Sequence, residues 1–272
     1  MRPVRQMFAD DYNRESDILK TEFNFIRIGC FGSASLYVIL DMNVSEFPHN
    51  LFLDLDGNFI YHKRPIANII STEWYLSNSS RTKLTRDFTK SIWIPTEGGD
   101  LAISILFQNL EGTLTTERFH IEQTLAIKSP ISSEMNILVS HGTNEIAINQ
   151  AIYPNESPKL NVSPILGTGK ILILFVCHSG SIRSTPFENS VSTLVKKFLS
   201  EGYVSIIAPF WSLHIDIPPI WLPKLLEELN KGESLAHAVH QANLVVFDSF
   251  PTIAAWACLH LYGDPHITLE TN

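Results

Sequence analysis

The chain has 272 residues, of which 44% are hydrophobic and 18% are charged, so it can bury a sizeable core and is too apolar for intrinsic disorder. Its 20 Lys and Arg residues against 28 Asp and Glu residues give a formal charge of −8. No basic run is present, which argues against nucleic acid as the direct ligand. The longest apolar run, residues 171–177, is too short to span a bilayer, so we expect no membrane association.

The three cysteines, Cys30, Cys177 and Cys258, are odd in number and lie far apart. They predict no disulfide framework, and no CxxC pair indicates a structural zinc site. The N-terminus lacks an apolar stretch of signal-peptide length. We therefore expect a reduced, soluble, cytoplasmic protein without a metal site or a cofactor.

The first half of the chain mixes element types, and the predicted hairpin turns at Asp56, Gly57 and Asn58. In chain order, the expected elements are a polar helix and a strand-like stretch within residues 1–40, a hairpin over 51–61, a loop over 77–90, a strand over 91–95 and a helix over 101–110. We interpret residues 1–90 as an N-terminal subdomain, or a pseudo-peptidase-like extension, and residues 91–272 as the core.

The second half alternates short apolar strands with amphipathic helices. The expected strands cover 136–140, 170–176 and 203–209, and the expected helices cover 190–200, 223–230 and 234–246. Strands that alternate with helices of about ten residues or more indicate βαβ units. The sequence therefore predicts an α/β fold with a mostly parallel sheet flanked by helices.

Two of the predicted strands end in a reactive side chain, His141 and Cys177. Because catalytic groups collect at the carboxyl ends of parallel strands, we expect the two side chains to meet at one edge of the sheet. An imidazole beside a thiol can take its proton and generate the nucleophilic thiolate. Gly142 and Gly180 follow in the two turns, where backbone N–H groups could face a developing oxyanion. The competing interpretation is that each residue is simply part of the core.

A second motif overlaps the same cysteine, since Cys177 and Arg183 fit the Cys-x5-Arg pattern of the phosphate-binding loop of cysteine phosphatases. This alternative predicts a phosphatase in which Arg183 holds the phosphate. It leaves His141 and Gly142 without a role, and the polar stretch after Pro186 delays the helix that should follow the loop.

Five ordered blocks over residues 136–269 resemble the CHAT family of bacterial caspase-like cysteine peptidases, in the clan of caspases, separases and gingipains. The blocks are Ile137 to Gly142, Ile173 to Gly180, Leu194 to Trp211, Gly232 to Ala242 and Trp256 to Pro265. The resemblance implies a caspase-like fold and a cysteine endopeptidase. CHAT domains often occur with tetratricopeptide repeats, which are missing from this chain. The resemblance therefore implies either activation by a separate regulatory or sensor protein in a bacterial signalling or defence pathway, or a stand-alone or excised domain.

What the resemblance implies for the site is a Cys-His dyad. Cys177 would attack the peptide carbonyl, His141 would protonate the leaving amine, and the N–H groups of Gly142 and Cys177 would hold the oxyanion. The sequence assigns no Asp or Asn as a third member. A catalytically inactive CHAT interaction module remains an alternative.

In caspase-like folds the pocket for the residue before the cleaved bond forms from two loops, which here cover residues 97–100 and 211–216. Both loops carry acid and neither carries Lys or Arg, which disfavours a preference for Asp. With Asp216 and Asp100 at the pocket, the expected preference is Arg or Lys. The alternative is an apolar pocket lined by Trp211 and Leu213, with Asp216 in solvent.

Overall fold

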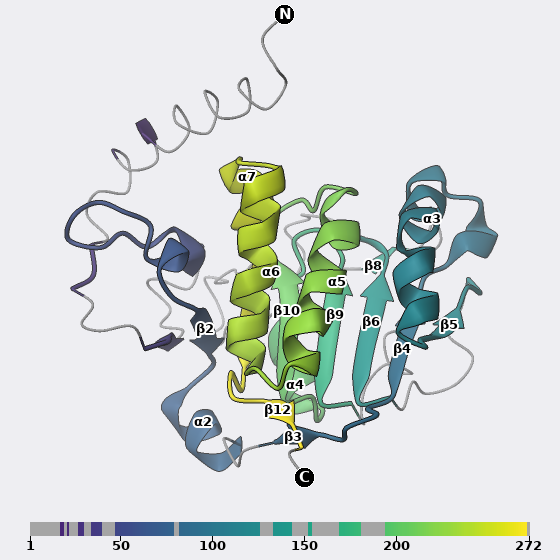
Figure 1. Cartoon of the computed structure of the whole chain (residues 1–272), viewed down its shortest axis with the longest axis horizontal. Coiled ribbons are helices and arrows are strands. Elements are labelled where there is room, and N and C mark those ends of the chain that lie inside the picture. Colours follow the sequence, from purple (N-terminus) through teal and green to yellow (C-terminus); the bar gives the residue numbers. More distant parts are fainter. Residues whose placement is uncertain are drawn as a thin grey trace, which may run out of the picture.

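The computed structural model describes residues 17–18, 21, 27–29, 34–39, 47–78, 82–125, 133–142, 152–153, 169–180 and 194–270. Its centre is an eight-stranded sheet in the order β1-β2-β11-β10-β9-β6-β4-β5 (Figure 1). The strands are β1 Leu36–Ile39, β2 Ile66–Ile69, β4 Lys90–Trp93, β5 His120–Glu122, β6 Met135–Val139, β9 Ile171–Phe175, β10 Ser205–Pro209 and β11 Leu259–Gly263.

The strands of the core half run in one direction, since β5, β4, β6, β9 and β10 pair in parallel. β11 pairs antiparallel with β10, and β2 and β1 continue in the direction of β11. The predicted α/β class with a mostly parallel sheet is therefore confirmed.

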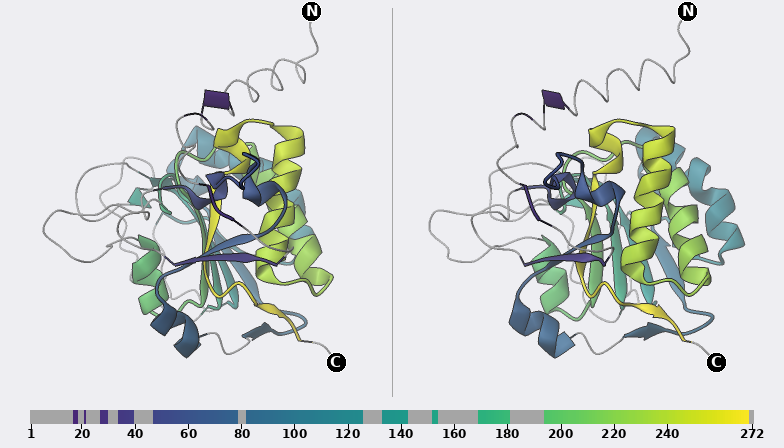
Figure 2. Two further views of the ribbon diagram at one scale, coloured as in Figure 1. Left: turned by 90° about the vertical axis from the view of Figure 1, so that its left-hand side faces the viewer. Right: turned by 60° about the vertical axis from the view of Figure 1, so that its left-hand side comes forward.

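Alternate residues of each central strand enter two separate cores, as the two-residue period of a strand requires. In β9, Ile171, Ile173 and Phe175 join the larger core, and Leu172 and Leu174 join the smaller one. The larger core includes α3 (Leu101–Thr116), α5 (Ile217–Asn230) and α6 (Leu235–Ser249), and the smaller core includes α4 (Leu194–Ser200). Figure 2 shows α5 and α6 on one side of the sheet and α4 on the other. The sheet is thus buried on both faces, as its continuous apolar strands predict.

The segment predicted as a hairpin forms a tighter turn with a single antiparallel bridge, between Leu53 and Phe59. Two 3-10 helices flank it, η1 His49–Leu51 and η2 Ile60–His62. Residues that are consecutive in sequence, such as Ile60 and Tyr61, are both buried here. The segment therefore lacks the alternation of buried and exposed side chains that a half-exposed hairpin would show. Gly57 occupies the turn with φ +79°, a conformation that glycine adopts without steric cost.

Two helices are longer than the sequence pattern predicts. α3 continues to Thr116, and α5 begins at Ile217, six residues before the expected start at Pro223. Pro218 and Pro219 explain the earlier start, because the first helical positions need no intrahelical N–H donor and favour the fixed φ of proline. The remaining short elements are α2 Thr72–Asn78, β3 Lys83–Leu84, η3 Thr96–Gly98, β7 His141–Gly142, β8 Ile152–Tyr153, α7 Ile253–Trp256 and β12 Thr268–Leu269.

Strands from both sides of residue 90 share the central sheet. β2 lies between β1 and β11 and pairs with both in parallel. A division of the chain into residues 1–90 and 91–272 remains a prediction. β1 and β2 lie in the same eight-stranded sheet as the strands that follow residue 90. Within the described ranges, no helix has the length and apolar character needed to cross a membrane.

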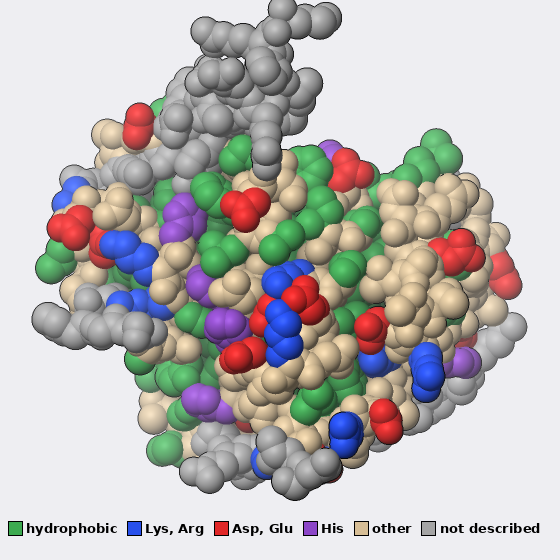
Figure 3. Space-filling model, in the orientation of Figure 1, with side chains coloured by type: hydrophobic (Ala, Val, Ile, Leu, Met, Phe, Trp, Pro, Cys, Tyr) green, Lys and Arg blue, Asp and Glu red, His purple; other side chains and the backbone are tan. Residues whose placement is uncertain are grey.

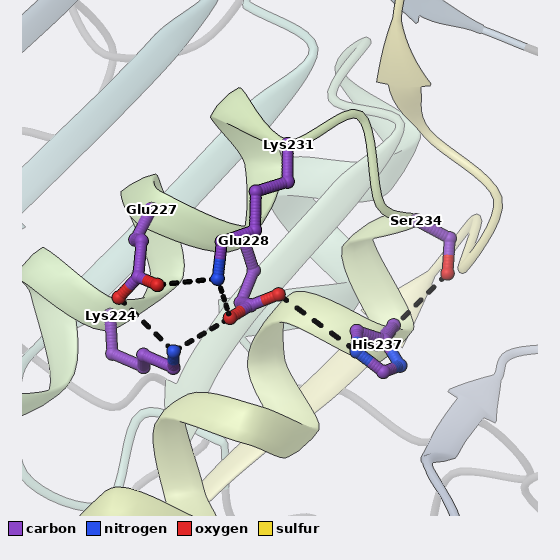
Figure 4. Close-up of polar contacts among 6 residues, drawn as sticks. All are labelled: Lys224, Glu227, Glu228, Lys231, Ser234 and His237. Carbon is purple, nitrogen blue, oxygen red and sulfur yellow. Dashed lines mark hydrogen bonds and ion pairs between the residues drawn. The ribbon is translucent and has the colours of Figure 1, made fainter.

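Charged side chains gather over α5 and α6 on the outer surface of the molecule (Figure 3). Glu228, whose side chain is only 8% exposed, lies 2.7 Å from Lys224 Nζ and 2.9 Å from Lys231 Nζ. His237 Nε2 on α6 lies 4.0 Å from the same carboxylate (Figure 4). The buried acid therefore links the C-terminal half of α5 to the first turn of α6.

Candidate active site

His141 and Cys177 follow two adjacent parallel strands at the same level. Val139 of β6 pairs with Phe175 of β9, and each reactive residue lies two positions beyond its strand's last pair. Both side chains line one cleft of about 90 Å³ at the carboxyl edge of the sheet. The structure thus brings together an imidazole and a thiol from segments 36 residues apart in sequence.

The cleft lies where α3 and α5 begin, beside the upper ends of β6 and β9 in Figure 1. Its lining comes from four segments and is mostly apolar. The lining residues are Ala102, Ile103, Leu106, Val139, Ser140, His141, Phe175, Cys177, Leu213, His214, Ile215 and Pro218.

The backbone around Cys177 is fixed by close packing and hydrogen bonds. A Cβ built on Gly142 would overlap the carbonyl oxygen of Cys177, so only glycine allows the two turns to approach this closely. His178, with φ +60°, donates its N–H to Trp211 O at 3.1 Å, and Gly180 donates to Pro209 O at 2.9 Å. The turn after β9 is therefore held against the end of β10.

The sulfur of Cys177 has a defined polar neighbour, since the backbone N–H of Leu213 donates to Cys177 Sγ at 3.4 Å. This contact ties the thiol to the loop between β10 and α5. Cys258 is different: it is fully buried, and burial raises the pKa of its thiol well above the ordinary value, as expected for a structural cysteine.

Asp100 contacts His141 directly. Its Oδ2 lies 2.7 Å from His141 Nε2, while its Oδ1 accepts the backbone N–H of Ile103 at 3.0 Å as the N-cap of α3. Partial burial raises the pKa of Asp100, but the hydrogen bonds from Ile103 and His141 outweigh burial, and the net pKa is lowered. Asp100 is therefore a carboxylate at neutral pH, and His141 Nε2 carries the hydrogen that it accepts.

This pairing leaves the other ring nitrogen, His141 Nδ1, as the one that can accept a proton. Sequence reasoning placed Asp100 in the substrate pocket and assigned no acid to the histidine. In the structure the two oxygens of Asp100 accept from His141 Nε2 and from Ile103 N–H, and Asp100 itself is not among the residues that line the cleft. An acid that caps the helix directly after the first strand of the core was the available sequence signal.

Asp216 and Trp211, the other two residues predicted at the substrate pocket, are not among the residues that line the cleft. Asp216 has a side chain that is 50% exposed, and its Oδ2 lies 3.5 Å from His214 Nδ1. Trp211 directs its Nε1 to Ala254 O at 2.7 Å. The neighbouring residues Leu213 and Ile215, on the same loop, do line the cleft.

The phosphate-binding alternative depends on Arg183, which lies outside the described residues. His178, the residue after Cys177, lies with its Nε2 3.1 Å from Ser212 Oγ. Among the described residues, no group of three or more His, Cys, Asp or Glu side chains is arranged to hold a metal ion.

Comparison with solved structures identifies the fold. The chain superposes on the Saccharomyces cerevisiae separase–securin complex with a TM-score of 0.60 at 14% identity, over 85% of this chain and 15% of the matched chain. It superposes on gingipain R, an Arg-specific cysteine proteinase, with a TM-score of 0.54 at 11% identity, over 95% of this chain and 68% of that chain. A complex of Porphyromonas gingivalis gingipain pro- and mature domains matches with a TM-score of 0.51 at 11% identity, over 93% and 69% of the two chains.

The described part of the chain therefore has the caspase-like fold, which separase and gingipain share. No family model matches the sequence, and no curated protein sequence matches it. The likeness to the CHAT family accordingly rests on the sequence motifs alone.

Proposed function

We propose that this protein is a cysteine peptidase that acts through Cys177 and His141. The observation that carries the proposal is the equivalent position of the two residues, each two residues beyond the register pair Val139–Phe175 and each lining the same cleft. The caspase-like fold supports it, since separase and gingipain are cysteine proteases of that fold.

The reaction would start with transfer of the thiol proton of Cys177 to His141 Nδ1. The thiolate then attacks the carbonyl carbon of the peptide bond, and the carbonyl electron pair moves to oxygen. Backbone N–H groups of Gly142 and Cys177 are the proposed donors to that oxyanion. Collapse of the intermediate expels the amine, which takes the proton from His141, and water hydrolyses the remaining thioester.

Asp100 would act as a positioning residue. By accepting the hydrogen on His141 Nε2, it selects the tautomer whose Nδ1 can serve as the base, and it stabilises the imidazolium that forms during the reaction. The exposed fraction of the two side chains, 48% for His141 and 19% for Asp100, leaves the imidazole open to substrate while its partner is more enclosed.

Several finer features of the proposal come from the CHAT resemblance: a specific protein substrate, activation by a regulatory or sensor partner, and a cytoplasmic place in a bacterial signalling or defence pathway. The separase structure is a complex with securin, which supports a protein partner for a chain of this fold. In such a system the isolated chain would be inactive until the partner rearranges the site.

The test is covalent labelling of Cys177 by a peptidyl chloromethylketone, followed by intact-mass and peptide-mapping measurements, with and without a cell lysate as a source of the trigger. Cys177→Ala should abolish labelling and cleavage with little change in melting temperature, because Cys177 lies at the cleft rather than in a core. His141→Ala should slow labelling strongly. Efficient labelling of His141→Ala at the wild-type rate would contradict the dyad.

The two alternatives give different results in the same samples. A phosphatase would hydrolyse p-nitrophenyl phosphate and lose that turnover in Arg183→Ala, whereas a peptidase has no such need of Arg183. An inactive interaction module would show neither activity even with the trigger present.

A further inference from the structure

We infer that the cleft beside Cys177 selects a peptide with an uncharged aliphatic side chain, such as Leu or Met, before the cleaved bond. This inference rests on the proposed peptidase function and specifies its substrate class. It departs from the preference for Arg or Lys that the acidic loops of the sequence predicted.

The position of the cleft makes it the binding site for that side chain. Its walls include the first turns of α3 and the loop between β10 and α5, and Cys177, whose Sγ accepts from Leu213 N–H of that loop, lines the same cleft. A peptide whose carbonyl lies at Cys177 Sγ therefore places an adjacent side chain within reach of Ile103, Leu213 and Ile215.

The walls of the cleft are apolar and belong to the larger core. Ile103, Leu106, Val139 and Phe175 are all at most 7% exposed and pack in that core, which fixes the shape of the cleft before substrate binds. An aliphatic side chain that enters it gains apolar burial at these preformed surfaces.

No Asp, Glu, Lys or Arg is among the described residues of the lining. Both oxygens of Asp100 are occupied, by His141 and by Ile103 N–H. Asp216 lies outside the lining, and His214, the remaining ionisable lining residue besides the dyad, has a side chain that is 68% exposed. A charged substrate side chain would therefore lose its hydration without gaining a partner.

The volume of the cleft also restricts its occupant. A cavity of about 150 Å³ accommodates a benzene molecule, and this cleft of about 90 Å³ is smaller. The size fits a Leu, Val or Met side chain better than a Phe, Tyr or Trp ring.

The test uses five peptidyl acyloxymethyl ketones that differ only in the residue before the ketone: Leu, Met, Asp, Lys and Arg. The second-order rate of Cys177 alkylation is measured by mass spectrometry, with Cys177→Ala as the blank. We expect Leu and Met to react at least about 10-fold faster than the three charged probes, the discrimination typical of an apolar pocket. Arg or Lys reacting as fast as Leu would overturn the inference and leave the peptidase function intact. The rates are measured with and without a cell lysate as the source of the trigger. If none of the probes alkylates Cys177 in either condition, the proposed function fails and the inference falls with it.

A change of specificity provides the second arm. Ile215→Glu adds a carboxylate to the lining and should raise the Arg and Lys rates relative to Leu by about 10-fold or more. The matched control is Ile105→Glu, the same change on α3 at a residue that is 39% exposed and outside the lining, which should leave the ratio unchanged. If Ile215→Glu does not fold, Leu213→Glu, at another lining residue of the same loop, is used in its place. Equal shifts in the lining variant and the control would show a general charge effect and contradict the assignment.

Discussion

The two carboxylate oxygens of Asp100 make two different contacts, one with the backbone at the start of α3 and one with the imidazole of His141. Oδ1 caps α3 through Ile103 N–H, and Oδ2 accepts from His141 Nε2. A single residue thus fixes where the helix begins and how the imidazole is oriented. Since both contacts depend on the same side chain, a suitable pair of substitutions can separate them.

Asp100→Asn should keep the cap and lose the orientation of the histidine. Asn caps helices about as well as Asp, but its amide offers an N–H to Nε2 and favours the tautomer with hydrogen on Nδ1. We expect kcat to fall by about 10²- to 10⁴-fold, as in other sites where the carboxylate on a catalytic histidine is replaced by an amide. The measurement is kcat and KM against pH, together with the free energy of unfolding.

Two further variants complete that experiment. Asp100→Ala should show the same loss of activity and an additional loss of about 1 kcal/mol of stability from the missing cap. Asp100→Glu, which retains the charge, should recover part of kcat. Wild-type kcat and an unchanged pH profile in Asp100→Asn would show that the contact with His141 is only structural.

At the scale of the element, α5 and α6 are joined by a shared core and by the charges around Glu228. On the inner side, α5 contributes Leu225 and Leu229 and α6 contributes Leu235 and Val239 to the larger core. On the outer side, Glu228 forms ion pairs with Lys224 and Lys231. Ser234 caps α6 by accepting from His237 N–H at 3.3 Å, which brings His237 to the same acid (Figure 4). The turn between the helices is therefore held by the Glu228 ion pairs at the end of α5 and by the Ser234 cap at the start of α6.

Glu228→Gln should lower the melting temperature at pH 7 by about 2–4 °C, the shift that about 1 kcal/mol produces in a domain of roughly this size. Hydrogen bonds from Lys224 and Lys231 lower the pKa of Glu228 in the folded chain. The contribution is therefore present above the unfolded pKa, about 4.3, and is lost as the pH falls through the folded value. Differential scanning calorimetry at pH 7 and pH 3 measures this, and the difference in melting temperature between the two proteins should be smaller at pH 3 than at pH 7.

The matched control for Glu228 is Glu227→Gln, on the same helix. Glu227 contacts the same two lysines, but its side chain is 51% exposed, so solvent screens its ion pairs and the loss should be much smaller. Equal losses in the two variants would mean that burial of Glu228 does not matter.

At the scale of the whole molecule, the sheet buries a histidine that stays uncharged at neutral pH. His260 of β11 is 1% exposed and lies against the rings of Phe210, Trp211 and Tyr262. Burial, with a smaller contribution from the charge of His49, lowers the pKa of His260 to about 3. The unfolded chain therefore binds a proton at this residue several pH units before the folded chain does.

His260→Phe should make the protein less sensitive to acid. Because the folded pKa of His260 lies below the unfolded value of about 6.5, its contribution to stability is complete above pH 6.5 and decreases as the pH falls toward 3. For wild type this single group should account for a loss of about 2 kcal/mol between pH 7 and pH 5. Urea unfolding at both pH values measures the difference.

Phe keeps the aromatic contacts of that position and removes the titrating group. The decrease in the free energy of unfolding from pH 7 to pH 5 should therefore be smaller in His260→Phe than in wild type. His120→Phe, at an exposed position of β5, is the control and should retain the wild-type loss. An unchanged pH dependence in His260→Phe would show that other groups govern acid unfolding.

The sequence by itself determined the fold class and the strand ends on which the site is built. Apolar strands such as 171–175 specify a sheet buried on both faces, and the two reactive residues follow those strands directly, so the local pattern was enough to predict that His141 and Cys177 lie at one edge of the sheet. The start of α5 and the turn after Leu53 were not predicted correctly. Prolines at the start of the helix hide its apolar periodicity, and burial of consecutive residues in the turn removes the alternation expected of a hairpin.

Only the tertiary structure decided which acid contacts the histidine and what lines the cleft. Asp100 and His141 are 41 residues apart, and the cap signal at Asp100 predicts where a helix begins but does not say which imidazole the second carboxylate oxygen contacts. Asp216 and Leu213 lie on the same loop, yet the fold directs Leu213 into the cleft and leaves Asp216 half exposed. The reason is physical: strand order and register bring distant backbone segments together, but the direction of a loop side chain depends on packing between elements that the sequence pattern does not encode.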